Sequence, residues 1–143
     1  MLGYKDFAGC DQEGFVDKNH TTPAHVGESS QFETMIKGSN AQRVLADKAY
    51  ASTANRDALK GKHRDGILHK AVRARPLRQS QKRFKKLISK HRFRSEQCFD
   101  TMKRLFGLYR AQYFGVAKIH AQMVMAALSQ TLLKAVHKIT FNR

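Results

Sequence analysis

The stretch from Gln79 to about Tyr113 constrains the fold most, because its pattern predicts one long α-helix. Between Arg92 and Arg104 it contains no proline or glycine. Its apolar side chains recur at steps of three and four residues, the spacing that places them on one helix face. These side chains are Phe99, Met102, Phe106, Tyr109 and Tyr113. We therefore predict a helix with one buried stripe, and a break is expected near Gly107 or Gly115.

Three charged residues of this helix are expected to share a second face. Arg92, Glu96 and Lys103 are separated by four and seven residues, so a helix lines them up. A carboxylate between cations can be an ordinary ion pair at the surface, which is the more common arrangement. It can also be a metal-binding acid beside residues that hold phosphate. The spacing alone leaves both interpretations open.

The chain carries a large excess of positive charge for its 143 residues. Its formal net charge is +16 at pH 7, which makes nucleic acid the leading partner, because such an excess is self-repulsive without a polyanion. Sixteen Lys or Arg and three acids lie between Lys60 and Arg104, a net of +13. This run is either a solvated face or a track for phosphates. An acidic membrane surface is the weaker alternative, since no segment suits it.

The first third of the chain predicts a hairpin followed by a helix. Residues 2–20 alternate weakly between apolar and polar around a turn-rich centre, which favours a β-hairpin. Pro23 is expected to leave the sheet, because proline cannot donate to a central ladder. A helix is predicted over Glu28–Lys37, and Ser29 and Ser30 are its candidate caps.

The next section predicts the order strand, helix, strand. Arg43–Ala46 is a short apolar run, typical of a strand buried on both faces. A helix capped by Ser52 or Thr53 follows, and then a second short strand at residues 65–68. A last helix is predicted from Val116 to Lys138. Its expected buried stripe comprises Ile119, Met123, Ala127, Leu128, Leu132 and Val136. This order favours an α/β fold with helices packed on a small sheet.

Cysteine content and hydropathy indicate the cellular setting. Cys10 and Cys98 are too few for a disulfide framework, and nothing in the sequence marks either as reactive. We find no signal peptide, and the longest apolar run, Met123–Leu128, is far too short to span a membrane. A reducing, cytoplasmic setting is therefore expected. The seven histidines show no convincing zinc spacing.

Asp47 is the strongest candidate for chemistry outside the long helix. It directly follows the predicted strand Arg43–Ala46, where the backbone is fixed and the side chain can reach a ligand. An Asp in this place is more often a turn or capping residue. If folding brings Asp47 within roughly 4–7 Å of Glu96, the two carboxylates can share divalent metal ions, which take hard oxygen ligands.

Two motifs give the chain a resemblance to a known family. Residues 44–50, Val-Leu-Ala-Asp-Lys-Ala-Tyr, resemble the Ala-Asp-x-Gly-Tyr motif around the second catalytic acid of bacterial insertion-sequence DDE transposases. Arg92-x3-Glu96-x6-Lys103 is similar to the family's signature around the third acid, Tyr-x2-Arg-x3-Glu-x6-Lys. The opening Gly3-Tyr4-Lys5 also resembles the strand that follows the first acid. The resemblance spans most of the chain.

The resemblance implies an RNase-H-like fold and metal-dependent DNA strand cleavage and transfer at the ends of the element. Asp47 and Glu96 would be the second and third acids and would hold Mg²⁺ or Mn²⁺. The expected DNA-binding residues are Arg92, Lys103, Arg104, Lys85 and Lys86. The partner would be double-stranded DNA, with the protein as a homodimer in the DNA complex. The expected location is the cytoplasm, in association with the nucleoid.

The sequence departs from the family pattern at three places. Ser89 stands where the signature has Tyr, and Ala49 where Gly is usual. The first acid would lie upstream of the Gly3-Tyr4-Lys5 strand, and neither Asp6 nor Asp11 takes its place. We therefore expect residues 1–143 to be the C-terminal part of a DDE catalytic domain, from a truncated copy that catalyses poorly.

This catalytic-domain fragment is expected to have its hairpin and strands over about 1–70 and its helical part over about 79–138.

Two other functions remain open. One is a basic module that binds DNA without catalysis, which would explain the same positive charge. The other is a small basic ribosome-associated protein, which would leave both motifs unexplained.

Overall fold

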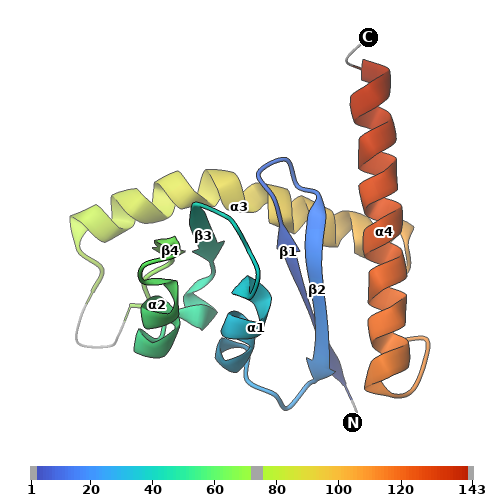
Figure 1. The fold of residues 1–143 in the computed structure, drawn as a ribbon, viewed down its shortest axis with the longest axis horizontal. Coiled ribbons are helices and arrows are strands. Elements are labelled where there is room, and N and C mark those ends of the chain that lie inside the picture. The colour runs from blue at the N-terminus through green and yellow to red at the C-terminus, as the bar shows by residue number, and fades with distance from the viewer. Residues whose placement is uncertain (1–2, 72–75, 142–143) are drawn as a thin grey trace. The chain divides into compact units, whose positions relative to one another are not determined.

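A computed structural model describes residues 3–71 and 76–141 (Figure 1). The chain divides into two compact units. The first contains Met1–Val26 and Phe93–Arg143, and the second contains Gly27–Arg92. Helices and small sheets alternate along the chain, so the predicted α/β class is confirmed. Among the described residues, no helix is long and apolar enough to cross a membrane.

The first unit begins with the predicted hairpin. Strand β1 (Tyr4–Cys10) pairs antiparallel with β2 (Val16–Pro23). The Asp11 carboxylate accepts hydrogen bonds from the backbone N–H groups of Glu13 and Phe15 in the connecting turn, at 2.9 and 2.8 Å. Gly14 has a φ of +83°, a conformation that favours glycine, and this closes the turn.

The prediction that the chain leaves the sheet before Pro23 was wrong. Pro23 is the last residue of β2 and lies opposite Tyr4, and pairing continues with a hydrogen bond from the Ala24 N–H to the Gly3 carbonyl. A proline at the end of a strand costs little, because the ladder does not need its missing donor there. Thr21 is consequently buried within the strand.

Helix α3 (Gln79–Leu105) confirms the start of the predicted long helix and ends at the expected weak point. Gly107 follows it with a φ of +70°, so the chain turns away from the helix. Met102 is fully buried, as predicted for the apolar stripe. Tyr109 and Tyr113 lie beyond the helix and are exposed, so their assignment to the stripe was wrong.

Helix α4 (Val116–Phe141) packs beside β2 in the first unit (Figure 1). Thr21 of β2 is hydrogen-bonded to Asp6 at 2.8 Å, and its hydroxyl lies 3.2 Å from His120 Nδ1 of α4. The buried side chains of α4 are Ile119, Met123, Ala126, Ala127 and Gln130. The core of this unit forms where Met102 of α3 meets the two alanines.

Half of the side chains predicted to form the buried stripe of α4 are exposed instead. Leu128, Leu132 and Val136 are more than half exposed, although Ile119 and Met123 are buried as expected. Apolar residues surround this helix on all sides, so periodicity alone could not tell which face packs on the hairpin.

The second unit is built around a short strand–helix–strand arrangement. Strand β3 (Arg43–Ala46) pairs in parallel with β4 (Arg64–Ile67), and α2 (Thr53–Leu59) connects them. Helix α1 (Phe32–Ile36) contributes Phe32 to a core that also contains Leu59 and Ile67. Gly66 is required in β4, because a Cβ there would collide with the Val44 carbonyl and the Leu45 side chain.

In the second unit, one predicted helix cap is present, a second pair of predicted caps is not, and β3 is less buried than predicted. Ser52 caps α2 by accepting a hydrogen bond from the Asn55 N–H at 3.1 Å, as expected. Ser29 and Ser30 do not act as caps, because they lie within the 3₁₀ turn Ser29–Gln31, whose N-cap residue is Glu28 and has no side-chain cap hydrogen bond. β3 is not buried on both faces, because Leu45 remains 36% exposed in a sheet of two strands.

Candidate functional site

Asp47 lies where the sequence predicted, directly after β3. It caps the 3₁₀ turn Lys48–Tyr50, and its Oδ1 accepts a hydrogen bond from the Lys48 N–H at 2.5 Å. The side chain is 41% exposed, so the carboxylate stays accessible from solvent. Asp47 is therefore a capping residue with one oxygen directed to its own turn. The second oxygen, Oδ2, can interact with a cation.

Arg92 supplies that cation within the second unit. Its Nη2 lies 3.5 Å from Asp47 Oδ2, although the two residues are separated by 45 positions in the chain. This distance is longer than that of a good hydrogen bond, and both groups are partly exposed, so the pair is weak. The contact links the two sequence motifs: the arginine of one lies beside the acid of the other.

Asn55 holds the turn that carries Asp47, and sequence reasoning missed it. Its buried side-chain amide donates to the carbonyls of Tyr50 and Ser29, each at 3.0 Å. Burial, together with the negative charges of Glu28 and Asp47, raises the pKa of Tyr50 to about 12, so its phenol remains neutral. The sequence feature that could have indicated this role of Asn55 is a polar residue three positions after the Ser52 cap.

We expect Asn55→Ala to destabilise the second unit by about 2–3 kcal/mol, because two carbonyls lose their buried donor. Urea unfolding measures the loss, and hydrogen exchange at residues 48–50 locates it. Asp57→Ala on the exposed side of the same helix is the control, expected within about 0.5 kcal/mol of the natural protein. Equal unfolding midpoints for the two variants would contradict this role.

Glu96 is exposed on the part of α3 that belongs to the first unit. Its approach to Asp47 stays a prediction, because Asp47 belongs to the other unit. Lys103 is exposed, whereas Arg104 pairs with Asp100 at 2.9 Å one helical turn away. In residues 3–71 and 76–141, no group of three or more His, Cys, Asp or Glu side chains could hold a metal ion.

The first half of α3 presents a basic surface in the second unit. Its exposed side chains are Lys82, Arg83, Lys85 and Lys86. Ser89, in the place of the expected tyrosine, donates its hydroxyl to the Lys85 carbonyl at 2.8 Å. This serine is satisfied inside its own helix, so the cations dominate the chemistry of this surface. Such a surface can bind the phosphates of a nucleic acid.

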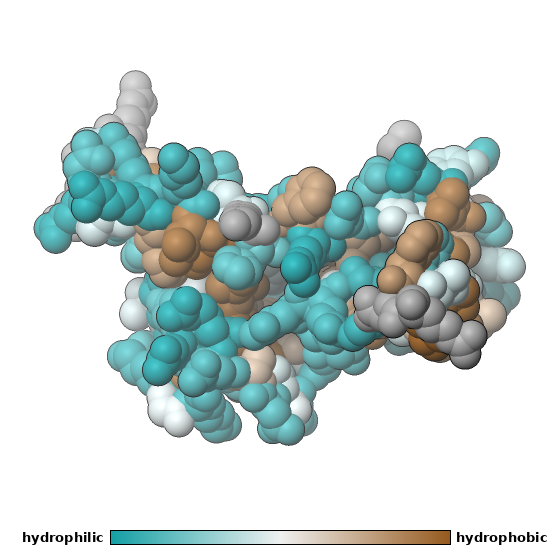
Figure 2. Space-filling model, turned by 90° about the horizontal axis from the view of Figure 1, so that it is seen from above, coloured by the Kyte–Doolittle hydropathy of each residue, from teal (hydrophilic) through white to brown (hydrophobic). Residues whose placement is uncertain are grey.

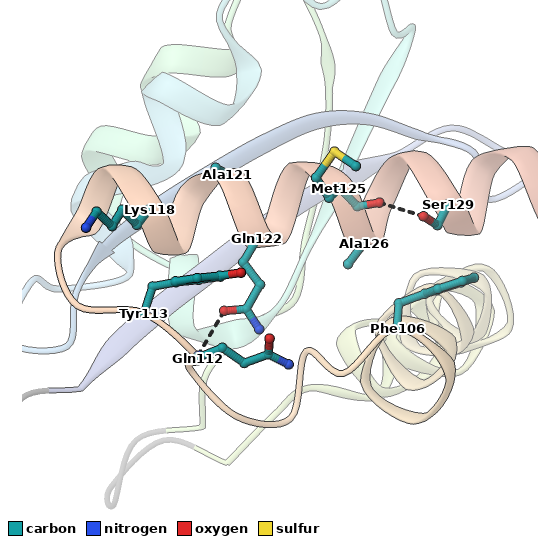
Figure 3. Close-up of a pocket in the computed structure, with 9 residues that line it drawn as sticks. All are labelled: Phe106, Gln112, Tyr113, Lys118, Ala121, Gln122, Met125, Ala126 and Ser129. Atoms are coloured by element: carbon teal, nitrogen blue, oxygen red, sulfur yellow. Dashed lines mark hydrogen bonds between the residues drawn. The ribbon is translucent and has the colours of Figure 1, made fainter.

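A cavity of about 540 Å³ lies between α4 and the segment after α3 in the first unit (Figure 3). Gln122 Oε1 accepts the backbone N–H of Gln112 at 3.1 Å and so fastens this segment to α4. The lining includes Phe106, Tyr113 and Met125. Lys118 is the charged side chain of the lining, and no carboxylate takes part among the described residues. The cavity therefore does not suit a divalent metal, which requires oxygen ligands such as carboxylates.

The chain is similar to known proteins over most of its length. The family described as "Transposase DDE domain" matches residues 2–132. A transposase for insertion sequence element IS1106 from Neisseria meningitidis serogroup B is 40% identical over 141 residues. The matched region covers 97% of the present chain and 49% of that relative, so the chain spans about half of the relative's length. No solved structure matches the chain.

Proposed function

The chain belongs to the transposase DDE domain family of insertion sequences, and we propose that it takes part in metal-dependent DNA strand cleavage and transfer at element ends. One observation carries this proposal. Asp47 at the carboxyl end of β3 lies beside Arg92 of α3, as expected if both motifs form one site. DNA cleavage by this family uses phosphoryl transfer, in which metals and cations stabilise the developing charge.

We assign residues 1–143 to the C-terminal part of an RNase-H-like catalytic domain. The antiparallel hairpin β1–β2 and the parallel β3–β4 pair with its helical crossover support this assignment. Asp47 and Glu96 would be the second and third catalytic carboxylates. We assign neither Asp6 nor Asp11 as the first carboxylate, and we expect little turnover from two acids, since two metals are held better by three.

The proposed metal ligands are Asp47 and Glu96. Both carboxylates are accessible from solvent, and carboxylate oxygens are the ligands that Mg²⁺ and Mn²⁺ prefer. A bound divalent metal would polarise the phosphodiester and activate the attacking oxygen. Asp47 would then exchange its weak contact with Arg92 for the metal, and Arg92 would hold a DNA phosphate. Lys103 would hold DNA in the same way.

We expect Asp47→Asn and Glu96→Gln each to weaken Mn²⁺ binding at least tenfold, since each removes a charged ligand of the shared site. Titration followed by electron paramagnetic resonance measures the affinity. Asp57→Asn, an exposed acid on α2, is the control and should leave the affinity unchanged. If the three variants bind Mn²⁺ alike, the metal site is wrong.

The alternative function is that of a DNA-binding module without catalysis, and one observation supports it. The Asp47 carboxylate already has an arginine partner, as a purely structural acid would. In that case Asp47→Asn and Glu96→Gln would retain DNA binding and show no change in metal affinity. The DNA-binding surface is common to both functions. Its proposed residues are Lys85, Lys86, Arg92, Lys103 and Arg104, and a cytoplasmic, nucleoid-associated location would follow.

We further propose that the protein forms a homodimer in the DNA complex through the outer face of α4. Much of the face drawn in Figure 2 is hydrophilic, with hydrophobic side chains exposed in patches. The outer face of α4, here called the α4 stripe, is exposed and apolar. It comprises Met125, Leu128, Leu132, Val136 and Ile139.

The spacing and charges of the α4 stripe favour a second copy as its partner. Its members follow one another at steps of three and four residues, as in helices that pair along their length. The lysines of this part of α4 face the hairpin instead: Lys134 and Lys138 each lie 5.8 Å from the Phe15 ring. Lys138 also pairs with Glu13 at 2.5 Å. Two copies of the stripe can therefore meet without repulsion, which a two-fold axis requires.

A further inference from the structure

The cavity between α4 and the segment after α3 adjoins the α4 stripe. Met125 belongs to both, because it lines the cavity and is 62% exposed as the first member of the stripe. Phe106 and Tyr113 line the cavity from the other side, and Tyr113 is 51% exposed (Figure 3). An open, largely apolar hollow that continues an exposed apolar stripe suits a side chain of another protein molecule.

Four of the lining residues on α4 have the spacing of a packing hole. Lys118, Ala121, Gln122 and Met125 follow one another at steps of three, one and three residues, so they surround one point on the helix surface. In paired helices, one side chain of the facing helix inserts into a hole of this kind as a knob. Ala121 has the smallest side chain of the four and is exposed, so it leaves the hole open.

We infer that this hole receives Ile139 of a second copy, so that the two α4 helices pair in antiparallel orientation. The inference rests on the proposed dimer through the α4 stripe, and it adds the orientation, the register and the role of the cavity. Ile139 is 67% exposed near the opposite end of α4. Only an antiparallel partner brings this side chain to the hole at residues 118–125, because in a parallel pair Ile139 meets its own copy.

The register that follows pairs apolar residues along the whole stripe. When Ile139 faces Ala121, the two-fold axis passes midway between Leu128 and Leu132. These two leucines then face each other across the copies, at the centre of the interface. The remaining facing pairs are also apolar, and they are Met125 with Ala135 and Val136 with Val124.

The charge of Lys118 favours the antiparallel orientation. Lys118 lies in the first turn of α4, which contains no acid, beside the partially positive N-terminus of its own helix. In the antiparallel pair it meets the last turn of the partner helix, whose terminal carbonyls carry partial negative charge. In a parallel pair it would meet the same lysine of the second copy, and the two cations would repel each other.

Disulfide cross-linking between intact chains tests the orientation. Ala121→Cys and Ile139→Cys chains are prepared separately, mixed with double-stranded DNA and oxidised mildly. We expect a covalent dimer whose linked peptides contain positions 121 and 139, at least about tenfold more abundant in the mixture than with either variant alone. The natural chain controls for links through Cys10 and Cys98. Linkage of position 121 to itself, as a parallel pair gives, or no link between 121 and 139 overturns the inference.

Filling the hole provides a second measurement. Ala121→Trp should raise the dissociation constant of the dimer at least about tenfold, because the indole occupies the space that Ile139 needs. Ala54→Trp, at an exposed alanine of α2, is the control and should leave the constant unchanged. If Ala121→Trp has no effect while Asp at both Leu128 and Leu132 still separates the copies, the stripe dimer stands and this register is wrong. A natural chain that stays monomeric overturns both.

Discussion

The affinity of this chain for double-stranded DNA is expected to fall about 10³- to 10⁵-fold when the salt concentration rises from 50 to 200 mM. This range corresponds to roughly six to ten phosphate contacts, each of which releases counterions from the duplex. The net charge of +16 and the exposed cations along α3 supply enough groups for that number. Fluorescence anisotropy of a labelled duplex at several salt concentrations measures the slope. A flat salt dependence would contradict binding through the DNA backbone.

Replacing two lysines of α3 tests where the DNA-binding surface lies. Replacing both Lys85 and Lys86 by Ala should reduce the slope of log affinity against log salt by about 2. It should lower the affinity for all DNA sequences alike. The control replaces Lys37 and Lys60, which lie at the ends of α1 and α2 and carry the same total charge. An equal loss in both double variants would mean that net charge, and not the basic surface of α3, determines the affinity.

Local patterns in the sequence predicted the elements of the fold well. The hairpin, β3 and the start of α3 follow from alternation, a short apolar run and helical spacing, which are properties of the chain itself. The position of Asp47 at the end of β3 was predictable for the same reason. Glycine was a reliable sign of the end of α3, because Gly107 adopts a positive φ there.

Tertiary contacts determined what the sequence could not predict. Nothing local indicates that Arg92 lies beside Asp47, or that Asn55 fastens the turn that carries this acid. Local rules also misplaced Pro23, whose effect on a strand depends on whether its position needs a donor.

The α4 stripe shows most clearly where such reasoning fails. Leu128, Leu132 and Val136 satisfy every local criterion for a buried stripe, yet they face solvent. The buried side of the same helix includes Ala126 and Ala127, two small side chains that pack against Met102 of α3. Two apolar faces on one helix imply two packing partners. The hairpin and α3 occupy one face, and we propose that a second copy occupies the other.

Substituting Asp for both Leu128 and Leu132 should therefore raise the dissociation constant of the dimer at least about 10³-fold. Removing one apolar side chain from the centre of an interface costs about 2 kcal/mol, and every 1.4 kcal/mol is a factor of about ten. The two-fold axis also places four carboxylates together, away from water and without partners. Sedimentation velocity across a range of concentrations, with and without DNA, measures the effect.

Leu87→Asp is the matched control, because Leu87 is 61% exposed on α3 and lies outside the α4 stripe. It introduces a carboxylate at a similarly exposed leucine, so it should leave the dimer intact. A natural chain that stays monomeric at all concentrations, with and without DNA, would show that the stripe has a different partner. Equal dissociation of the control and the α4 variant would mean that added negative charge, rather than removal of the apolar side chains, separates the copies.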